Sequence, residues 1–297
     1  MNNYLTYLHL LTPLHTGASV DEGNLMGVAR EVHTEFPHLP ASSVRGKIRS
    51  QVESQFKGSN EKAVATFFGQ KIKNGQQPTE GYVWFGDASL LFFPVASLSH
   101  HLVWVTCPLW LERWQRWYPG TVPLDGFLST MVQQLQNHQA IASFETSELY
   151  LQTAVVRSSQ LKVMEDNEKQ ALQPITDTLK SQSSLLARLP EKLVILDEEN
   201  CLSLVEVGLQ REVRVALEEN SKLVKGGSFR SEEAIPPETV LFVPWGVKPT
   251  GDRSDVETIS QTTYQTLSDR LQFGGLESLG RGWANLKTIN SKQEGQS

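Results

Sequence analysis

"FPHLPASSVRGKIRSQ", residues 36–51, packs two prolines, two serines and a run of cations into the expected start of a helix. Ser42 or Ser43 fits the N-cap position, because a serine hydroxyl accepts a hydrogen bond from a free N–H group of the first turn. The pattern predicts a helix from these serines to about Phe56. Its first turns carry several positive charges although the whole chain is acidic.

Those charges form one candidate binding site. Arg45 and Arg49 are four residues apart and share one helix face, with Lys47 further round. Free N–H groups at a helix N-terminus attract phosphate, and arginine adds forked, charge-assisted hydrogen bonds. Gly46 has no side chain, so a ribose-phosphate chain could come close. The alternative interpretation is a solvated amphipathic helix with no ligand.

Overall charge limits the function without excluding nucleic acid. The chain has 297 residues, 27 Lys and Arg and 33 Asp and Glu, giving a formal charge of −6. Uniform coating of nucleic acid is therefore excluded. The charge is segregated, however, since residues 45–73 hold seven cations (Arg45, Lys47, Arg49, Lys57, Lys62, Lys71 and Lys73) against two acids (Glu53 and Glu61). A local basic surface is expected.

Neither cysteines nor histidines form a metal-binding pattern. Cys107 and Cys201 have no C-x-x-C spacing, so no disulfide framework or cysteine zinc site is supported. His33 and His38 are five residues apart, which is not helical ligand spacing, and no metal is expected. Residues 1–15 lack a basic n-region and a long apolar run. We expect a cytoplasmic protein with no membrane partner.

Strand and helix patterns mix without a regular βαβ alternation, which favours an α+β fold with an antiparallel sheet. Strands are predicted by apolar and β-branched runs at 3–12, 81–97, 101–108, 239–247 and 282–289. Helices are predicted at 42–56, 109–118, 123–136 and 255–272. Residues 206–230 predict a hairpin with a long tip, turning through 218–221. A frayed tail is expected at about 289–297.

A second candidate site is the glycine-rich stretch "FGGLESLGRGWANL", residues 273–286. Gly274, Gly275, Gly280 and the neighbouring Arg281 could present successive N–H groups to an anion. The stretch lacks the G-K-[ST] of a P-loop and the G-x-G-x-x-G frame of a dinucleotide site. A purely structural turn at the entry to a strand is an equally good interpretation.

Acid–base chemistry has six candidate residues: His15, Asp21, Glu22, Glu31, Glu232 and Glu233. His15 follows the first strand, where an imidazole could orient a nucleophile or a phosphate. A small-molecule enzyme using His15 with Glu232 or Glu233 is one hypothesis. The chain contains no G-x-S-x-G or H-E-x-x-H motif that would support it. Each residue on its own is more commonly structural.

Taken together and in order, five segments resemble the RAMP superfamily of CRISPR proteins, and specifically the repeated backbone subunit of type III-B (Cmr) effector complexes. The resemblance extends from about residue 4 to 288. The segments are "PLHTG" (13–17), "REVHTEFPHLPASSVRGKIR" (30–49), "FGDASLLFFPVAS" with "LVWVTCPLWLERW" (85–114), "KGGSFRSEEAIPPETVLF" (225–242) and "FGGLESLGRGWANL" (273–286).

The resemblance implies a single domain over residues 1–297. Its fold would be a modified ferredoxin-like or RRM-like palm with an antiparallel sheet, an inserted helical region and a thumb-like β-hairpin, for which 206–230 is the candidate. It also implies that several copies stack along a guide RNA and that the thumb wedges between bases. The implied partners are crRNA, complementary target RNA, further copies of the chain and other type III subunits, including the large polymerase-like one.

The resemblance also assigns binding residues. Ser42, Ser43, Arg45, Gly46, Lys47 and Arg49 match the family's small-small-x-basic-Gly element, which cradles the guide backbone. Gly274, Gly275, Gly280 and Arg281 match its glycine-rich partner. Such binding is independent of sequence and requires no cofactor.

Family members that cut target RNA carry an aspartate five residues before the arginine matched by Arg30. Leu25 stands at that position in this chain. Leucine can neither accept a proton nor hold the divalent ion, Mg²⁺, that cleavage would use. We therefore expect a binding subunit with weak or absent nuclease activity, in which His15 and Glu232 are remnants of the site. The alternative is an active metal-dependent endoribonuclease that uses Asp21.

Overall fold

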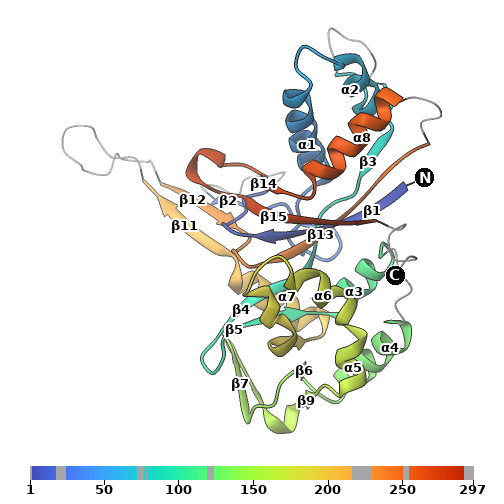
Figure 1. Ribbon diagram of the computed structural model, residues 1–297. Helices are drawn as coiled ribbons and strands as arrows, with labels where there is room; N and C mark the ends of the chain where they lie inside the picture. Colours follow the sequence, from blue (N-terminus) through green and yellow to red (C-terminus); the bar gives the residue numbers. More distant parts are fainter. Residues whose placement is uncertain are drawn as a thin grey trace.

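The computed structural model describes residues 2–17, 25–71, 77, 79–118, 124–215, 229–249 and 254–290 (Figure 1). It shows the α+β fold expected from the sequence, with one large sheet and several helices. Within these residues no helix is both long and apolar enough to cross a membrane.

A ten-stranded sheet runs through the molecule in the order β14-β15-β1-β13-β4-β5-β10-β6-β9, with β3 beside β13. Its central strand, β1, pairs antiparallel with both β13 and β15. The strands are β1 (Asn2–Leu10), β3 (Val83–Phe85), β4 (Ser89–Ser97), β5 (His101–Thr106), β6 (Ala140–Ala142), β9 (Leu161–Val163), β10 (Leu193–Ile195), β13 (Val240–Val247), β14 (Arg270–Gln272) and β15 (Trp283–Asn290).

The sheet is antiparallel as expected except at one end, where two pairs of neighbouring strands are parallel. β10 pairs parallel with β5, and β9 pairs parallel with β6. Parallel neighbours need a long crossover connection. The chain between β5 and β10 supplies it, because that stretch contains the inserted helices and returns to the sheet in the same direction.

Helices cover the sheet in two groups (Figure 1). α1 (Ala41–Gln55), α2 (Glu61–Phe68) and α8 (Ser254–Thr266) pack together at the top of the view. The second group lies in the lower half of the view, below β1, β13 and β15: α3 (Pro108–Gln115), α4 (Leu124–Leu135), α5 (Asp166–Ala171), α6 (Gln173–Lys180) and α7 (Glu198–Gly208). Short 3₁₀ helices occur at Ser158–Gln160, Leu186–Glu191 and Glu277–Leu279, and a small hairpin pairs β7 (Glu148–Leu151) with β8 (Ala154–Arg157).

Strand β1 supplies side chains to two apolar cores. Leu8 and Leu10 belong to the cluster that includes α1, α2 and α8, whereas Leu5 and Tyr7 belong to the cluster around α4 and α6. Successive strand residues point to opposite faces, so a strand covered on both sides must be apolar throughout. This explains the nearly unbroken apolar sequence that predicted a first strand.

A separate three-stranded sheet has the order β11-β12-β2, formed by β11 (Gln210–Arg214), β12 (Arg230–Ala234) and β2 (Leu25–Met26). β11 and β12 form the base of the predicted hairpin and project from the body at the left of Figure 1. The predicted bounds, 206–230, are wrong at the base: residues 206–208 end helix α7, and β12 continues to Ala234. The predicted turn at 218–221 lies outside the described residues.

The predicted N-cap of α1 is also wrong. The helix begins at Ala41, so Ser42 and Ser43 lie inside its first turn, and Pro40 occupies the N-cap with no side-chain cap. The Ala41 N–H instead donates to Asp87 Oδ1, at 2.7 Å. A carboxylate from a distant segment thus does what a local serine was expected to do, and it adds negative charge at a helix N-terminus.

Other element ends differ from the prediction by a few residues. β1 ends at Leu10 rather than at residue 12, and the helix predicted at 255–272 ends at Thr266, after which 270–272 form β14. Residues 289 and 290 belong to β15, so they are not a frayed tail, and 291–297 lie outside the described residues. Helices α3 and α4 confirm the predictions for 109–118 and 123–136.

The Asp87 cap predicts a measurable loss of stability. Asp87→Ala removes the acceptor for the Ala41 N–H, and we expect the free energy of unfolding to fall by about 1 kcal/mol. Ser42→Ala is the matched control and should cause no loss, because the Ser42 hydroxyl caps nothing. Urea unfolding of both variants measures the difference; a larger loss from Ser42→Ala would contradict this assignment.

Candidate functional site

Three segments far apart in the sequence meet at the end of β1. Leu14 forms an antiparallel bridge with Ile235, just beyond β12, and His15 forms one with Gly275 of the glycine-rich loop. The Gly275 N–H donates to the His15 carbonyl at 2.8 Å, and the Leu14 N–H donates to the Ile235 carbonyl at 2.9 Å. The structure thus brings together the "PLHTG" turn, the hairpin base and the glycine-rich loop.

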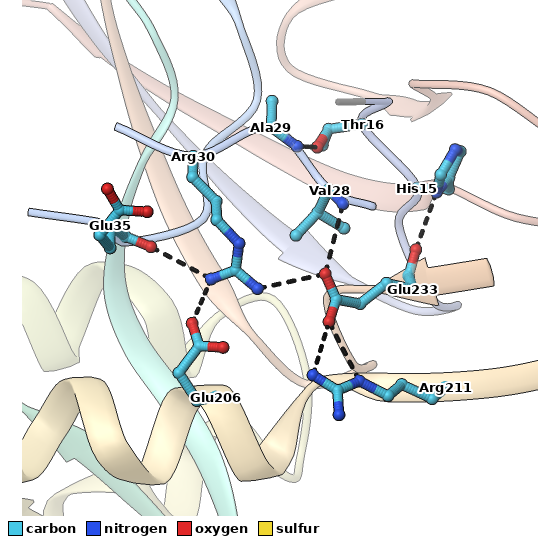
Figure 2. Close-up of polar contacts among 9 residues, drawn as sticks. All are labelled: His15, Thr16, Val28, Ala29, Arg30, Glu35, Glu206, Arg211 and Glu233. Atoms are coloured by element: carbon cyan, nitrogen blue, oxygen red, sulfur yellow. Dashed lines mark hydrogen bonds and ion pairs between the residues drawn. The ribbon is translucent and has the colours of Figure 1, made fainter. Parts of the chain in front are cut away.

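His15 is 4% exposed, and its ring points at the main chain of Glu233 (Figure 2). Its Nδ1 lies 2.8 Å from the main-chain carbonyl oxygen of Glu233. Because a carbonyl only accepts, Nδ1 carries the proton and Nε2 is the accepting nitrogen of the neutral ring. The Glu233 carboxylate points elsewhere, toward two arginines (Figure 2). This arrangement does not favour a catalytic His15–Glu233 pair.

Glu232, a predicted catalytic residue, is 5% exposed and forms part of an ion-pair cluster. Its Oε1 accepts from Arg281 Nη2 at 2.6 Å and lies 3.1 Å from Arg214 Nη2. Arg281 Nη2 also lies 2.6 Å from Glu212 Oε2, and Arg214 Nη2 lies 3.3 Å from the same oxygen. The cluster joins the hairpin base to the glycine-rich loop.

The cluster shifts the ionisation of its members. The hydrogen bond from Arg281 is the main reason that the pKa of the Glu212 carboxyl lies below its usual value. Burial would lower the pKa of Arg281, but its contacts with Glu212 and Glu232 outweigh burial and raise it. Arg281 was predicted to bind phosphate; here its guanidinium faces two carboxylates. Its role toward RNA stays a prediction.

Glu233 points to the other face of β12 and gathers a second set of donors (Figure 2). Its Oε1 accepts from Arg211 Nε and Nη2 at 3.1 and 3.0 Å, and its Oε2 accepts from Arg30 Nη2 at 3.2 Å. The Val28 N–H donates to Oε2 at 3.4 Å. Arg30 also donates to Glu206 of α7, so one carboxylate joins the 25–30 segment, the hairpin and, through Arg30, helix α7.

This second cluster was not predicted from the sequence. Glu233 was expected only as a possible acid–base residue, and Arg30 only as the match to an arginine of the family pattern. The sequence signal that could have found it is the pair "QREVR" and "RSEEA", since the hairpin register places Arg211 opposite Glu233. Cross-strand pairs of opposite charge are favourable. The contributions of Arg30 and Glu206 depend on tertiary structure.

Helix α1 contacts the glycine-rich loop through one of its cations. Lys47 Nζ lies 2.9 Å from Glu277 Oε1, which brings the two predicted phosphate-binding segments side by side. Arg49 pairs with Glu53 at 2.8 Å, and Arg45 donates to the Phe68 carbonyl. Burial, followed by the nearby charge of Arg49, lowers the pKa of Arg45.

The N-terminal surface of α1 is open near its small residues. Ser42 and Gly46 are exposed and Ser43 is half-buried. A Cβ built on Gly46 meets no atom within 4 Å, so nothing inside the chain requires glycine there. The predicted close approach of a ribose-phosphate chain is compatible with this open surface and stays a prediction.

The glycine-rich loop needs its glycines for folding. Gly274 has a φ of +78°, and a Cβ on it would lie 2.2 Å from the His15 carbonyl oxygen. Gly280 has a φ of +77° but open space around it. Gly282 combines a φ of +79° with a Cβ position 1.8 Å from the Phe273 carbonyl oxygen. Only glycine adopts this conformation at no steric cost.

The position of the expected catalytic aspartate is well defined. Leu25 lies in β2 and pairs with Ser231 of β12, while Met26 pairs with Glu232. Asp21 lies outside the described residues. Among the residues that the structure does describe, there is no cluster of three or more His, Cys, Asp or Glu side chains that could hold a metal ion.

Residues 7–285 match the family model of the RAMP superfamily, so the chain belongs to that superfamily. It is 27% identical over 291 residues to the CRISPR system Cmr endoribonuclease Cmr4 of Pyrococcus furiosus, covering 96% of this chain and 95% of the relative. These findings confirm the resemblance recognised in the sequence.

Solved structures confirm the fold class. A crystal structure of oligomeric Cmr4 from Pyrococcus furiosus matches 98% of this chain and 99% of its own, with a TM-score of 0.66 and 23% identity. A chain of the type III-B Cmr-beta complex bound to cognate target RNA matches at a TM-score of 0.74 and 18% identity, covering 96% of each chain.

The loop geometry predicts different outcomes for two similar substitutions. Both Gly274→Ala and Gly280→Ala place an L-residue at positive φ, which costs about 1–2 kcal/mol. Gly274→Ala also pushes a methyl group into the His15 carbonyl, so we expect a clearly larger loss of stability. Urea unfolding compares them directly, with Gly280→Ala as the matched control; equal losses would contradict the described loop conformation.

Proposed function

We propose that this chain is a guide-RNA-binding backbone subunit of a type III CRISPR effector complex that acts in antiviral defence. Several copies would stack along crRNA and hold the duplex that crRNA forms with target RNA. The observation that carries the proposal is the likeness, over nearly the whole chain, to Cmr4 and to a chain of a Cmr complex bound to target RNA. Further partners would be other type III subunits, including the large polymerase-like one.

The contacts place the predicted binding segments side by side, which is compatible with an RNA backbone that crosses both. Lys47 and Glu277 join the basic helix α1 to the glycine-rich loop, and the loop in turn contacts the hairpin base through Arg281 and Glu232. Binding of this kind reads phosphate, ribose and A-form shape, while base pairing supplies specificity. A basic face on an otherwise acidic protein is sufficient, because only one side meets the guide.

We propose further that target cleavage is weak or absent. Leu25 stands where cleaving relatives are expected to carry an aspartate, and its side chain can neither take a proton nor hold Mg²⁺. Glu232, the other candidate carboxylate, is engaged by Arg281 and Arg214. His15 alone would leave the attacking 2′-hydroxyl without a carboxylate partner.

One observation favours an alternative, an active metal-dependent endoribonuclease that cuts target RNA at regular intervals: the relative from Pyrococcus furiosus is named an endoribonuclease. Asp21 precedes Leu25 by four residues, a length of chain that spans at most about 14 Å. In this alternative Asp21 takes the role of the missing carboxylate, with Mg²⁺ as the divalent ion.

Guide binding can be tested on helix α1. Arg45→Ala combined with Arg49→Ala should weaken guide-RNA retention whatever the guide sequence. The slope of log K for guide RNA against log salt concentration should also become less negative, by about 0.7 for each lost phosphate contact. A filter-binding series over salt concentration measures both. Arg116→Ala with Lys180→Ala removes the same charge from exposed ion pairs elsewhere and should change neither. Unchanged retention in the α1 variant would refute this assignment.

Cleavage can be tested with the assembled complex, end-labelled complementary RNA and Mg²⁺. We expect the native chain to protect the target and leave it intact. A regular ladder that Asp21→Ala abolishes would establish the endoribonuclease alternative. Leu25→Asp supplies the carboxylate at the expected position, so the appearance of a ladder in this variant alone would show that a single side chain separates binding from cleavage.

A further inference from the structure

We infer that Glu233 is a positioning residue: its buried carboxylate fixes the hairpin base to the 25–30 segment and, through Arg30, to helix α7. It thereby sets the register in which the hairpin meets guide RNA. The RNA part of this inference rests on the proposed function. The coupling between the three segments rests only on the contacts drawn in Figure 2.

The hairpin needs such a tie because its sheet is separate from the large one. The three-stranded sheet has its own strand order, and within the described residues β2 contributes the pairs Leu25–Ser231 and Met26–Glu232. Its main-chain connection to the large sheet includes the isolated bridge between Leu14 and Ile235. Side-chain contacts at the base therefore add to these main-chain pairs in setting the direction of a hairpin that projects from the body.

Glu233 makes these side-chain contacts with a buried carboxylate. Its side chain is only 3% exposed, and its two oxygens accept from Arg30, Arg211 and the Val28 N–H. The hydrogen bond from the Val28 N–H gives the 25–30 segment a main-chain contact with this carboxylate, beside the side-chain contact of Arg30. Residues 25 and 26 pair directly with β12, so main-chain pairing holds the start of the segment that the Glu233 carboxylate contacts at Val28 and Arg30.

Arg30 connects Glu233 to helix α7. Its guanidinium donates to Glu233, to Glu206 of α7 and, at 3.2 Å, to the Glu35 carbonyl. Burial alone would lower the pKa of Arg30, but the bonds and charges of Glu206 and Glu233 more than offset burial and raise it. The guanidinium therefore stays charged where it bridges the hairpin and helix α7.

Arg211 is a suitable control for Arg30, because it contacts Glu233 from within the same hairpin. It also contacts Glu233, but it lies on β11, directly opposite Glu233 in the same hairpin. Its side chain is 57% exposed. Loss of Arg211 removes one positive charge and one partner of Glu233 while leaving the links to the 25–30 segment and α7 in place.

The test uses the assembled complex with its guide RNA and four variants. Glu233→Gln and Arg30→Gln remove the contacts between the hairpin base, the 25–30 segment and helix α7. Arg211→Gln controls for the loss of an arginine. Glu112→Gln controls for the loss of a glutamate, because Glu112 pairs with Arg116 at an exposed position far from the hairpin in sequence. Hydroxyl-radical footprinting measures which nucleotides of the guide RNA are protected. Amide hydrogen exchange in the free protein measures how well residues 25–30 and the strands of the hairpin base are protected.

We expect Glu233→Gln and Arg30→Gln to speed amide exchange in the 25–30 segment and the hairpin base. We also expect both to blur or shift the regular footprint while guide RNA is still retained. Arg211→Gln and Glu112→Gln should preserve the footprint's register, even if Arg211→Gln lowers affinity. Glu233→Gln leaves two arginines facing a neutral partner, which destabilises buried sites. Should that variant not fold, Arg30→Gln decides the question.

Two results would overturn the inference: an unchanged footprint and unchanged exchange in a folded Arg30→Gln, or the same disturbance in Arg211→Gln. Failure of the proposed function looks different, because then the native complex would retain no guide RNA at all. In that case the exchange data would still show whether Glu233 couples the three segments, and the RNA part would fall with the proposed function.

Discussion

Hydrogen bonding on both edges of β1 is the constraint on which the site depends. β13 and β15 pair with this strand along nearly its whole length, so the chain that leaves β1 must pass between the segments that enter those two strands. One of these is the end of the hairpin base at Ile235, and the other is the glycine-rich loop at Gly275. Residues more than 200 positions apart therefore meet at His15, and main-chain pairing rather than side-chain contact brings them together.

Because side chains alternate along β12, two adjacent glutamates contact different parts of the structure. Glu232 and Glu233 point to opposite faces, and each binds two arginines, one from the neighbouring strand of the hairpin and one from outside it. A buried carboxylate is tolerable when its charge is paired and its oxygens accept hydrogen bonds. The hairpin is thus held from both sides, by the glycine-rich loop through Arg281 and by the 25–30 segment through Arg30.

The sequence predicted those features that depend on local patterns. The apolar strands, helices α3 and α4 and the body of α1 follow from periodicity, and the family resemblance supplied the fold. The N-cap prediction failed because Asp87 caps α1 from a distant segment. The hairpin boundary was misplaced because residues 206–208 continue helix α7. The ion pairs escaped prediction because nothing near Arg30 in sequence indicates that Glu206 and Glu233 will surround it.

The cations of α1 show how an acidic subunit could still present a basic groove. Lys47 and Arg49 each contact a carboxylate at a half-buried or exposed position. Ion pairs in such places contribute about 0–1 kcal/mol, whereas a phosphate brings full charge-assisted hydrogen bonds. Under the proposed function, a guide phosphate would draw Lys47 away from Glu277 at small cost.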